Sequence, residues 1–435
     1  MTHRLRKAVK SVIPHSVFRH VEPTGHLIEA AIVSTAHGMP ARKMRVIGVT
    51  GTNGKTTTCF MIHRMLVEAG YNVALMTTVA YGVGDSITPQ IAHMTTVSAP
   101  ELNKRIQQFK KQGVEWLVLE VTSHALAQHR VWGVPFEIAV MTNITHEHLD
   151  YHGSFKRYLQ AKRRLFTLAG RHQSGFGVIN ADDENAESFT SALGRCITYG
   201  TKGGDICAHD ITASPSGSRY VATVGGDRYV MHVNIPGEFN VSNSLAALAV
   251  GRHLGLTKRQ IEQGIAALKG VEGRMDTINA GQKYSVIIDF AHTPDSFERL
   301  LKDVRASTKG KLVAVFGSAG RRDEAKRAIQ GKIAGTYCDE VVLTEEDDRD
   351  IDGNEILNQI ASGAEKAGKV REKDLFLILD RSSAIQFAIT RVNNATDTVI
   401  FLGKGHEKTI ERADGEHPWN EAEEVQKAIQ ALNLP

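Results

Sequence analysis

The chain has 435 residues, and its 52 Lys and Arg against 48 Asp and Glu give a formal net charge of +4. This length predicts two or three domains, and so mild a charge, without a long basic stripe, argues against a nucleic-acid partner. No apolar run approaches the roughly 20 residues that a membrane-spanning helix needs. The four cysteines lack CxxC spacing, which is typical of thiols in a reducing compartment. We therefore expect a cytoplasmic monomer without a transmembrane segment.

Residues 1–44 are expected to form a short helical leader. Apolar residues at 5, 9, 12 and 13 share one helical face beside basic residues, and Pro14 ends that helix. A second helix is expected over residues 26–36, between two glycines. The basic amphipathic start suits a membrane surface, although docking on the body of the protein is the commoner role of such a helix.

The segment VIGVTGTNGKTTT, residues 46–58, is the most informative stretch of the chain. An apolar strand leads into a glycine-rich turn and then into an apolar-periodic helix, which is the context of a phosphate-binding loop. Glycines let backbone N–H groups face phosphate oxygens, and a helix N-terminus adds partial positive charge. Lys55 can reach the β- and γ-phosphates, and the Thr56 hydroxyl can hold Mg²⁺. Val49 stands where the general pattern has Gly or Ala, and a turn that merely joins a strand to a helix is the alternative.

From Arg45 to Gly273 strands and helices alternate. Buried strands are expected at 116–121, 137–143 and 176–180, and their polar carboxyl ends should meet beside the phosphate-binding loop. Residues 196–235 differ, because alternating runs at 220–224 and 229–233 predict antiparallel hairpins. A helix is expected from 240 to about 254.

A second α/β unit begins near Arg274. Its expected strands are 285–289, 311–316, 340–344, 375–379 and 398–402. The predicted fold class is therefore α/β: a central parallel-sheet domain of phosphate-binding-loop type over 45–273, with a small antiparallel insertion, and a Rossmann-like domain over 274–435.

Three polar groups accompany the phosphate-binding loop. Glu120 ends a strand near the expected phosphates and suits Mg²⁺, although an exposed glutamate that caps a strand is the alternative. His146-Glu147-His148 looks like part of a zinc motif but has no cysteines beside it. The segment is equally compatible with one histidine that binds Mg²⁺ or Mn²⁺ together with oxygen ligands. A solvated loop without a metal is a further alternative. Lys162 follows the pattern of an ordinary surface lysine on a helix.

A series of segments resembles the Mur ligases, and most of all their UDP-N-acetylmuramoyl-tripeptide synthetase branch. They run in family order from about residue 45 onward, and each is more specific than a phosphate-binding loop alone. The segments are GTNGKTTT at 51–58, EVTSHALAQHR at 120–130, TNITHEHLDYHGSFKRYLQAKRRLF at 142–166, GEFNVSNSLAAL at 237–248, GVEGRMD at 270–276, IDFAHTPDS at 288–296, FGSAGRRDEAKR at 316–327 and GKGHEKT at 403–409.

The resemblance implies an ATP-dependent ligase that forms an amide bond in peptidoglycan synthesis. ATP phosphorylates a carboxylate of a small-molecule muramoyl-L-alanyl-D-glutamate-type precursor to an acyl phosphate. The amino group of a diamino acid, meso-diaminopimelate or L-lysine, then attacks, and phosphate leaves. Lys55 and Mg²⁺ would neutralise the charge that develops on the γ-phosphate.

The resemblance also implies roles for individual residues. Lys55, Glu120, His148 and Lys162 would be catalytic, and Thr56, Glu120, His148 and Lys162 would surround the metal. Lys162 occupies the position of a carbamylated lysine, whose carboxylate-like anion would stabilise a second Mg²⁺. The nucleotide would contact Gly51, Thr52, Asn53, Gly54, Lys55, Thr56, Thr57, Asn240, Asn243, Arg274 and Asp289. Thr95, Thr96, Thr122, Gln128 and Arg130 would contact the muramoyl peptide, and Arg322, Asp347, Arg349, Gly403 and Glu407 the incoming amino acid.

Three departures from the family pattern bear on specificity. Glu346-Asp347-Asp348-Arg349 stands where diaminopimelate-adding members have DNPR. Arg349 suits bidentate pairing with a carboxylate of the substrate. Asp347 and Asp348, in place of Asn and Pro, favour a substrate side chain that carries an ammonium. Both diaminopimelate and lysine carry one, so the motif does not decide between them. His146-Glu147 replaces the more usual Arg-Asp. Only 44 residues precede residue 45, too few for the family's uridine-nucleotide-binding domain, so we expect weak discrimination between UDP-linked and UDP-free acceptors.

Two other functions stay open at the level of sequence. The same chemistry on another carboxylate acceptor would make the protein similar to folylpolyglutamate or cyanophycin synthetases, which share this architecture. A nucleotide-binding partner protein without catalysis is the other alternative.

Overall fold

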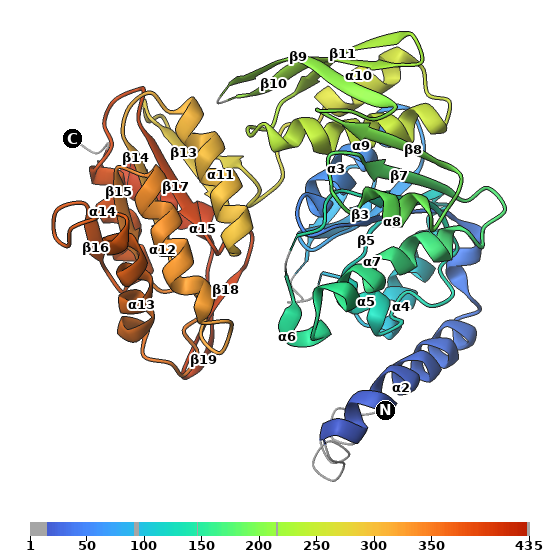
Figure 1. Ribbon diagram of the computed structural model, residues 1–435, viewed down its shortest axis with the longest axis horizontal. Coiled ribbons are helices and arrows are strands. Elements are labelled where there is room, and N and C mark those ends of the chain that lie inside the picture. The colour runs from blue at the N-terminus through green and yellow to red at the C-terminus, as the bar shows by residue number, and fades with distance from the viewer. Residues whose placement is uncertain (1–14, 91–94, 146, 215, 433–435) are drawn as a thin grey trace. The chain divides into compact units, whose positions relative to one another are not determined.

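The computed structural model describes residues 15–90, 95–145, 147–214 and 216–432. The chain divides into two compact units (Figure 1). The first comprises the residues up to His209 together with Ala222–Tyr229 and Ser242–Ala267. The second comprises Asp210–Val221, Val230–Val241 and the residues from Leu268 onward.

The larger sheet has eleven strands in the order β11-β10-β9-β8-β7-β6-β1-β5-β2-β3-β4. Its centre is parallel, since β1 pairs with both β5 and β6, while β3 pairs antiparallel with β2 and β4. The strands are β1 (Arg45–Thr50), β2 (Val73–Met76), β3 (Ala80–Val83), β4 (Ser86–Pro89), β5 (Trp116–Glu120), β6 (Phe136–Met141), β7 (Phe176–Asn180), β8 (Cys196–Gly200), β9 (Ile206–Ser214), β10 (Gly217–Val224) and β11 (Asp227–Val233).

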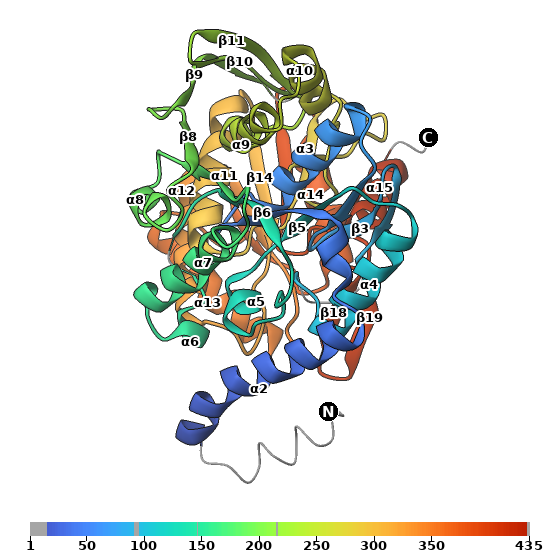
Figure 2. The same cartoon turned by 90° about the vertical axis from the view of Figure 1, so that its right-hand side faces the viewer.

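Helices cover both faces of this sheet (Figure 2). The buried apolar residues of α4 and α7 share one core cluster with alternate residues of β1 and β5, such as Val46 and Leu117. Gly48 permits this contact, because a Cβ there would lie 2.8 Å from Leu165 of α7. The helices are α3 (Lys55–Glu68), α4 (Ala99–Lys111), α5 (Ser123–Ala127), α6 (Leu149–His152), α7 (Phe155–Ala169), α8 (Ala186–Thr190), α9 (Phe239–His253) and α10 (Lys258–Ala266).

The segment 196–235 differs in part from the expected antiparallel insertion. The expected hairpin exists as β10 and β11, which are neighbours in the sheet and are joined at Gly225-Gly226. However, β8 pairs parallel with β7, and β9 pairs parallel with β8. The segment therefore extends the central sheet, because a hairpin whose inner neighbour offers an open edge satisfies its backbone groups by joining it.

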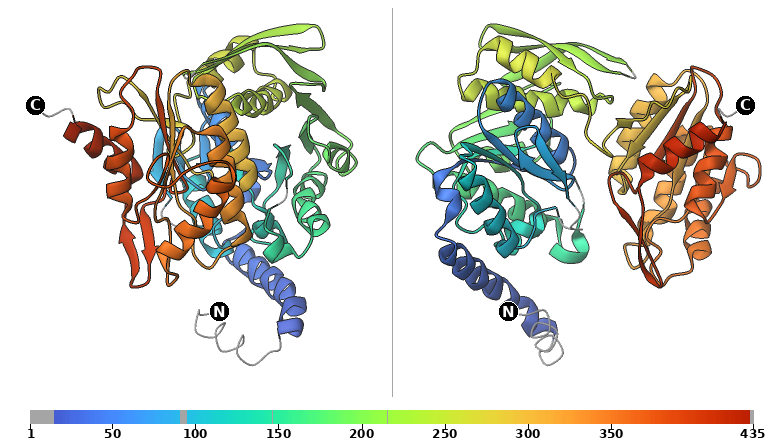
Figure 3. Two further views of the ribbon diagram at one scale, coloured as in Figure 1. Left: turned by 60° about the vertical axis from the view of Figure 1, so that its left-hand side comes forward. Right: turned by 180° about the vertical axis from the view of Figure 1, so that it is seen from behind.

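The helix before the first strand is longer than the sequence indicates. Helix α2 spans His15–Ala36 and packs on α4 (Figure 3), whereas a helix over 26–36 was expected. Pro23 and Gly25 lie inside α2, so the loss of one backbone hydrogen bond at a proline does not end the helix here. The expected amphipathic face at residues 5–13 lies outside the described residues. None of the helices that the structure describes is long and apolar enough to cross a membrane.

The second unit is built on a six-stranded sheet in the order β12-β13-β17-β14-β15-β16. All neighbours pair parallel except β12 with β13, and β18 and β19 form a separate antiparallel hairpin. The strands are β12 (Asp276–Thr277), β13 (Ser285–Asp289), β14 (Leu312–Phe316), β15 (Glu340–Leu343), β16 (Leu375–Leu377), β17 (Thr398–Leu402), β18 (Thr409–Arg412) and β19 (Gly415–Pro418).

Helices also flank this second sheet (Figures 1 and 2). Residues of α14 and α15 share a core cluster with β13, β14 and β17, and α11 and α13 pack against α12. The helices are α11 (Pro294–Ser307), α12 (Ala325–Tyr337), α13 (Gly353–Lys366), α14 (Arg381–Thr390) and α15 (Glu421–Leu432). The α/β fold class is confirmed, and the five strands expected in this unit are present as β13 to β17.

Candidate active-site residues in the two units

The loop between β1 and α3 has the backbone conformation that a phosphate-binding loop needs. Gly54, the N-cap of α3, has φ +79°, a left-handed conformation that favours glycine. A Cβ at Gly54 would lie 2.3 Å from Asn243 Oδ1, and one at Gly51 would lie 1.8 Å from Thr142 Oγ1. Both glycines are therefore required by close approach of neighbouring side chains.

Neighbouring strands hold this loop by hydrogen bonds. The Asn53 N–H donates to Asn143 Oδ1 at 2.9 Å, and Thr142 Oγ1 donates to the Asn53 carbonyl at 2.6 Å. Lys55 Nζ donates to the Thr52 carbonyl at 2.7 Å, so its ammonium lies across the loop. The polar residues after β6 thus meet the phosphate-binding loop, as the sequence predicted.

Thr56 and Glu120 form a buried pair at the carboxyl ends of β1 and β5. Glu120 is 1% exposed, and its Oε2 accepts hydrogen bonds from Thr56 Oγ1 at 2.9 Å, from the Thr78 N–H at 3.0 Å and from Thr78 Oγ1 at 3.1 Å. The alternative of an exposed glutamate that caps a strand is therefore wrong. Sequence reasoning missed Thr78, since nothing in its local pattern separates it from an ordinary threonine after a strand.

Lys162 is buried, 2% exposed, and its expected place on the helix surface is wrong. Its Nζ donates to the Gly51 carbonyl and lies 4.8 Å from the centre of the Tyr158 ring. Burial lowers the pKa of Lys162 well below its ordinary value, and the charge of Lys55 lowers it further, against the opposing pull of Glu147 and Glu120. The structure therefore places the Lys162 amine against the backbone of the phosphate-binding loop, where burial makes the amine easier to deprotonate.

His148 lies among aromatic side chains near the loop. Its ring centre is 4.7 Å from that of His124 and 6.3 Å from that of Tyr158, and its Nε2 is 3.6 Å from Glu147 Oε2. Tyr158 connects this group to the loop, because its hydroxyl lies 2.8 Å from Thr52 Oγ1. His146 lies outside the described residues. Across the residues that are described, no three His, Cys, Asp or Glu side chains are placed to hold a metal ion together.

The residues expected to contact the muramoyl peptide mostly lie together. Thr96 Oγ1 donates to the Glu120 carbonyl at 3.0 Å and lies 3.4 Å from Thr122 Oγ1. Arg130 donates from Nη1 to the Thr96 carbonyl at 2.7 Å and from Nε to Gln128 Oε1 at 2.9 Å. This polar group adjoins Glu120 through Thr96. Thr95 precedes it in the chain and is partly exposed.

The two asparagines expected near adenine lie on α9. Asn243 accepts a hydrogen bond at Oδ1 from Thr58 Oγ1 at 3.3 Å and lies over Gly54. Asn240 is buried and donates to the Pro236 carbonyl at 2.6 Å. Thr57 is buried in the first turn of α3.

Arg274 and Asp289 lie close together in the second unit. The Arg274 guanidinium stacks 4.7 Å from the Phe290 ring centre, and its buried Nε has no hydrogen-bond partner among the described residues. Asp289 accepts the Met275 N–H at 2.7 Å and the Ala291 N–H at 2.8 Å. Burial raises the pKa of Asp289, and the Arg274 charge opposes that rise.

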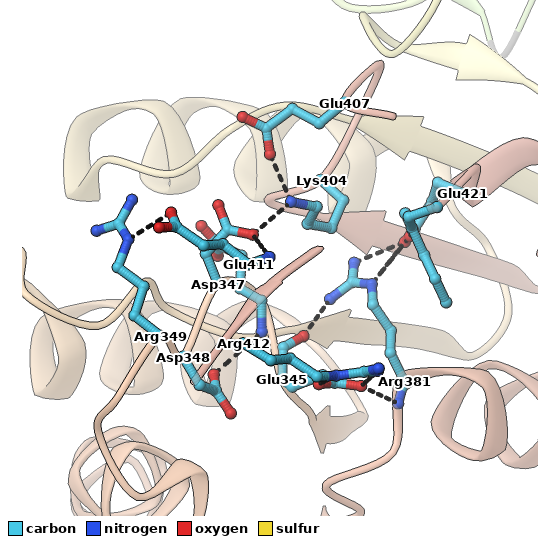
Figure 4. A network of polar contacts seen from close by, with 12 residues as sticks. Glu345, Asp347, Asp348, Arg349, Arg381, Lys404, Glu407, Glu411, Arg412 and Glu421 are labelled. Carbon is cyan, nitrogen blue, oxygen red and sulfur yellow. Dashed lines mark hydrogen bonds and ion pairs between the residues drawn. The ribbon is translucent and has the colours of Figure 1, made fainter. Parts of the chain in front are cut away.

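Three of the residues expected around the incoming amino acid, Asp347, Arg349 and Glu407, belong to a dense ionic network (Figure 4). Lys404 is fully buried and donates to Asp347 Oδ1 at 2.8 Å and to Glu407 Oε2 at 2.7 Å. Arg349 donates to Glu411 Oε2 at 2.8 Å and to the Gly320 carbonyl at 2.6 Å. Both Asp347 and Arg349 therefore already have partners within the protein, and no local pattern in the sequence indicates these partners.

Two further residues of this group differ in their surroundings. Arg322 is exposed, and no hydrogen bond or ion pair joins it to another residue that the structure describes. Gly403 has φ +97°, and a Cβ there would lie 2.6 Å from Glu346 Oε2. The Glu346 carboxylate therefore lies directly against the Gly403 backbone.

Comparison with known proteins covers nearly the whole chain. Residues 49–251 match the Mur ligase middle domain, and residues 273–405 match the glutamate ligase domain of Mur ligases. A UDP-N-acetylmuramyl-tripeptide synthetase of Roseiflexus sp. (strain RS-1) is 38% identical over 424 residues, which cover 94% of this chain and 83% of the relative. A UDP-N-acetylmuramoyl-L-alanyl-D-glutamate–2,6-diaminopimelate ligase of Clostridium tetani is 35% identical over 407 residues, 93% of this chain and 81% of the relative.

Solved structures agree with these matches. The structure of a UDP-N-acetylmuramoyl-L-alanyl-D-glutamate–2,6-diaminopimelate ligase aligns with a TM-score of 0.66 at 30% identity, covering 95% of this chain and 84% of that one. A folylpolyglutamate synthase of Mycobacterium tuberculosis shares the fold, with a TM-score of 0.70 at 16% identity over 93% of this chain and 95% of that one. Domain matches, close relatives and fold all agree, and the chain belongs to the Mur ligase family of ATP-dependent ligases.

Proposed function

We propose that the protein joins a diamino acid to the D-glutamate carboxylate of a muramoyl-L-alanyl-D-glutamate acceptor. ATP would convert that carboxylate to an acyl phosphate, and the amino group would displace phosphate to leave an amide. The names of the relatives support this acceptor class. The observation that carries the proposal is the buried arrangement of Thr56, Glu120 and Lys162 around the phosphate-binding loop.

The residues around the loop suit ATP with Mg²⁺. Thr56 and Glu120 would hold the cation, because a hydroxyl and a carboxylate are the hard oxygen ligands that Mg²⁺ prefers. Mg²⁺ bound there would neutralise charge on the phosphates. Lys55 needs only to exchange the Thr52 carbonyl for a phosphate oxygen, and its charge then offsets the charge that builds on the γ-phosphate.

The proposal includes carbamylation of Lys162. A neutral amine has a free electron pair, and burial favours that form of Lys162. The nitrogen would attack the carbon of CO₂, a C–N bond would form, and one proton would leave to solvent. The product carries a carboxylate-like group, which supports an assignment of Lys162 to the second Mg²⁺ position. His148, near Tyr158, is the remaining proposed metal ligand.

The acceptor would bind beside Glu120. Thr96, Thr122 and Arg130 form a connected polar group, and the Arg130 guanidinium can pair with a carboxylate of the peptide. Positioning that carboxylate in line with the γ-phosphate is the main requirement of phosphoryl transfer.

The test is an assay of ADP release and amide product with muramoyl-L-alanyl-D-glutamate acceptors, UDP-linked and UDP-free, crossed with several amino acids and with a folate acceptor. We expect ADP release and mass-detected amide only with muramoyl peptides. Amide formed on the folate instead would assign a different acceptor class. A protein that binds ATP and releases no ADP with any acceptor would be a nucleotide-binding partner rather than a ligase.

A further inference from the structure

The loop after β15 carries one carboxylate that differs from all its neighbours. Glu346 is only 7% exposed, yet within the described parts of the chain no side chain or backbone N–H donates a hydrogen bond to its carboxylate. Its Oε2 lies against Gly403, in the segment expected to contact the incoming amino acid. The Glu346 oxygens are not among the fully buried side-chain atoms that lack a partner, so this carboxylate keeps contact with solvent and is accessible to a cation.

The charges around Glu346 do not balance. Six carboxylates belong to this network, those of Glu345, Glu346, Asp347, Asp348, Glu407 and Glu411, against the three cations Lys404, Arg349 and Arg412. Arg381, which also attracts Glu346, is bound to the carboxylate of Glu421. Burial and the neighbouring acids raise the pKa of Asp348 to about 6, yet with Asp348 protonated an excess of acid remains.

Arg349 is the cation that could receive a second substrate carboxylate, and it is already occupied. Its Nε donates to Glu411 Oε2 at 2.8 Å and its Nη1 to the Gly320 carbonyl at 2.6 Å. The hairpin of β18 and β19 fixes Glu411 in place, because the Glu411 N–H donates to Asp347 at 2.9 Å and the Glu411 carbonyl accepts the Arg349 N–H at 3.0 Å. Arg322, which is exposed two residues after Gly320, would then receive the α-carboxylate that every amino acid carries.

From this arrangement we infer that the site selects an amino acid whose side chain ends in an ammonium and carries no second carboxylate, the class of L-lysine and L-ornithine, over meso-diaminopimelate. The side-chain ammonium would pair with Glu346 against Gly403, and Glu411 would exclude a distal carboxylate by holding Arg349. The inference rests on the proposed ligase function and goes beyond it, because the sequence motif at 346–349 does not discriminate between lysine and diaminopimelate as substrates.

The distal end of diaminopimelate shows why the preference has this direction. It carries an ammonium and a carboxylate, so its net charge is zero, whereas the end of lysine carries one positive charge. A site with excess acid attracts the positive end. Diaminopimelate would have to break the Arg349–Glu411 pair to neutralise its own carboxylate, and Glu411 would then remain as an unpaired carboxylate beside it.

The experiment compares kcat/KM for L-lysine, L-ornithine, meso-diaminopimelate and L-norleucine with one muramoyl-dipeptide acceptor. We expect lysine or ornithine to exceed diaminopimelate at least tenfold in the unaltered protein. Glu346→Gln should raise KM for lysine at least tenfold and leave norleucine unchanged, because norleucine has no ammonium. Glu411→Gln should shift the lysine-to-diaminopimelate ratio at least tenfold toward diaminopimelate by releasing Arg349.

Glu416→Gln is the matched control, because Glu416 lies opposite Glu411 in the same hairpin and is exposed; it should leave the ratio unchanged. Diaminopimelate used as well as lysine by the unaltered protein would overturn the inference while leaving the ligase function intact. Equal losses for lysine and norleucine in Glu346→Gln would also overturn it. No amide with any amino acid would instead overturn the proposed function on which the inference depends.

Discussion

At the scale of single residues, Lys162 shows a conflict between stability and function. Its folded-state pKa lies well below the ordinary value because it is buried, so at pH values between the folded-state pKa and the ordinary pKa the folded protein holds fewer protons than the unfolded chain. Folding then carries a cost that is largest at low pH and shrinks as pH approaches the ordinary lysine pKa of about 10.4. We predict that Lys162→Met abolishes ligation and raises the unfolding temperature at pH 7 in CO₂-free buffer.

The gain in unfolding temperature should shrink as the pH rises toward the ordinary lysine pKa, which a series of thermal unfolding curves would measure. Lys156→Ala, at an exposed position of the same helix, should alter neither activity nor the pH dependence. A Lys162→Met protein that keeps full activity, or a gain independent of pH, would show that Lys162 is an ordinary packed side chain.

In the proposed mechanism Lys55 acts through its charge, and its Nζ lies across the phosphate-binding loop, on the Thr52 carbonyl. We predict that Lys55→Ala lowers kcat by about a hundredfold or more, since charge stabilisers of this kind contribute on the order of 3 kcal/mol to the barrier. The measurement is ADP release at saturating ATP and acceptor. Near-normal turnover would remove this residue from the proposed mechanism.

At the scale of elements, one buried ion pair joins α14 to α15. Arg381 and Glu421 are both fully buried, with Nη2 and Oε1 2.6 Å apart, and Arg381 also donates to the carbonyls of Glu345 and Leu402. Removing one partner of such a pair leaves an uncompensated charge and costs about 3–5 kcal/mol. We predict a loss of this size for Glu421→Gln in the urea unfolding of the second unit.

Arg381→Met with Glu421→Met should recover part of that loss, because no buried charge then remains, although the two carbonyls lose their donor. Lys427→Ala, in an exposed pair with Glu424 on α15, should leave the unfolding midpoint unchanged. A double variant less stable than Glu421→Gln would show that the hydrogen bonds to the carbonyls, and not the charge, dominate.

At the scale of the whole molecule, the proposed chemistry requires residues of both units. The phosphate-binding loop belongs to the first unit, whereas the proposed amino-acid site, Glu346 to Arg349 and Gly403 to Glu407, belongs to the second. An acyl phosphate hydrolyses unless water is excluded, and closure of a domain is a common means of excluding it. We predict that a non-hydrolysable ATP analogue with acceptor reduces the radius of gyration measured by X-ray scattering.

The Lys55→Ala variant provides the control for this measurement, since weaker phosphate contacts should reduce the compaction. An unchanged radius of gyration with both ligands at saturation would contradict closure as a step of the reaction.

Elements whose signals are local could be predicted from the amino-acid sequence. The phosphate-binding loop could be predicted because Gly51 and Gly54 meet a requirement of the backbone at their own positions, and the strands of both units are continuous apolar runs. The segment that joins the larger sheet as β8 and β9 was harder to assign, because the choice of a strand's partner depends on which sheet edge lies open beside it.

Which polar side chains are buried together depends on how the elements pack in three dimensions. Lys162 follows Tyr158 by four residues and precedes Phe166 by four, on the buried stripe of α7. This spacing indicates a buried position, but a lysine is normally assigned to the surface because of its charge. Thr78 donates a hydrogen bond to Glu120, 42 residues away along the chain. Glu411 accepts one from Arg349, 62 residues away. Such contacts leave no local pattern, because the positions of whole strands and hairpins in the fold create them. The same physics decides the proposed specificity: the motif at 346–349 supplies the charges, and their neighbours determine which of them remain available to a substrate.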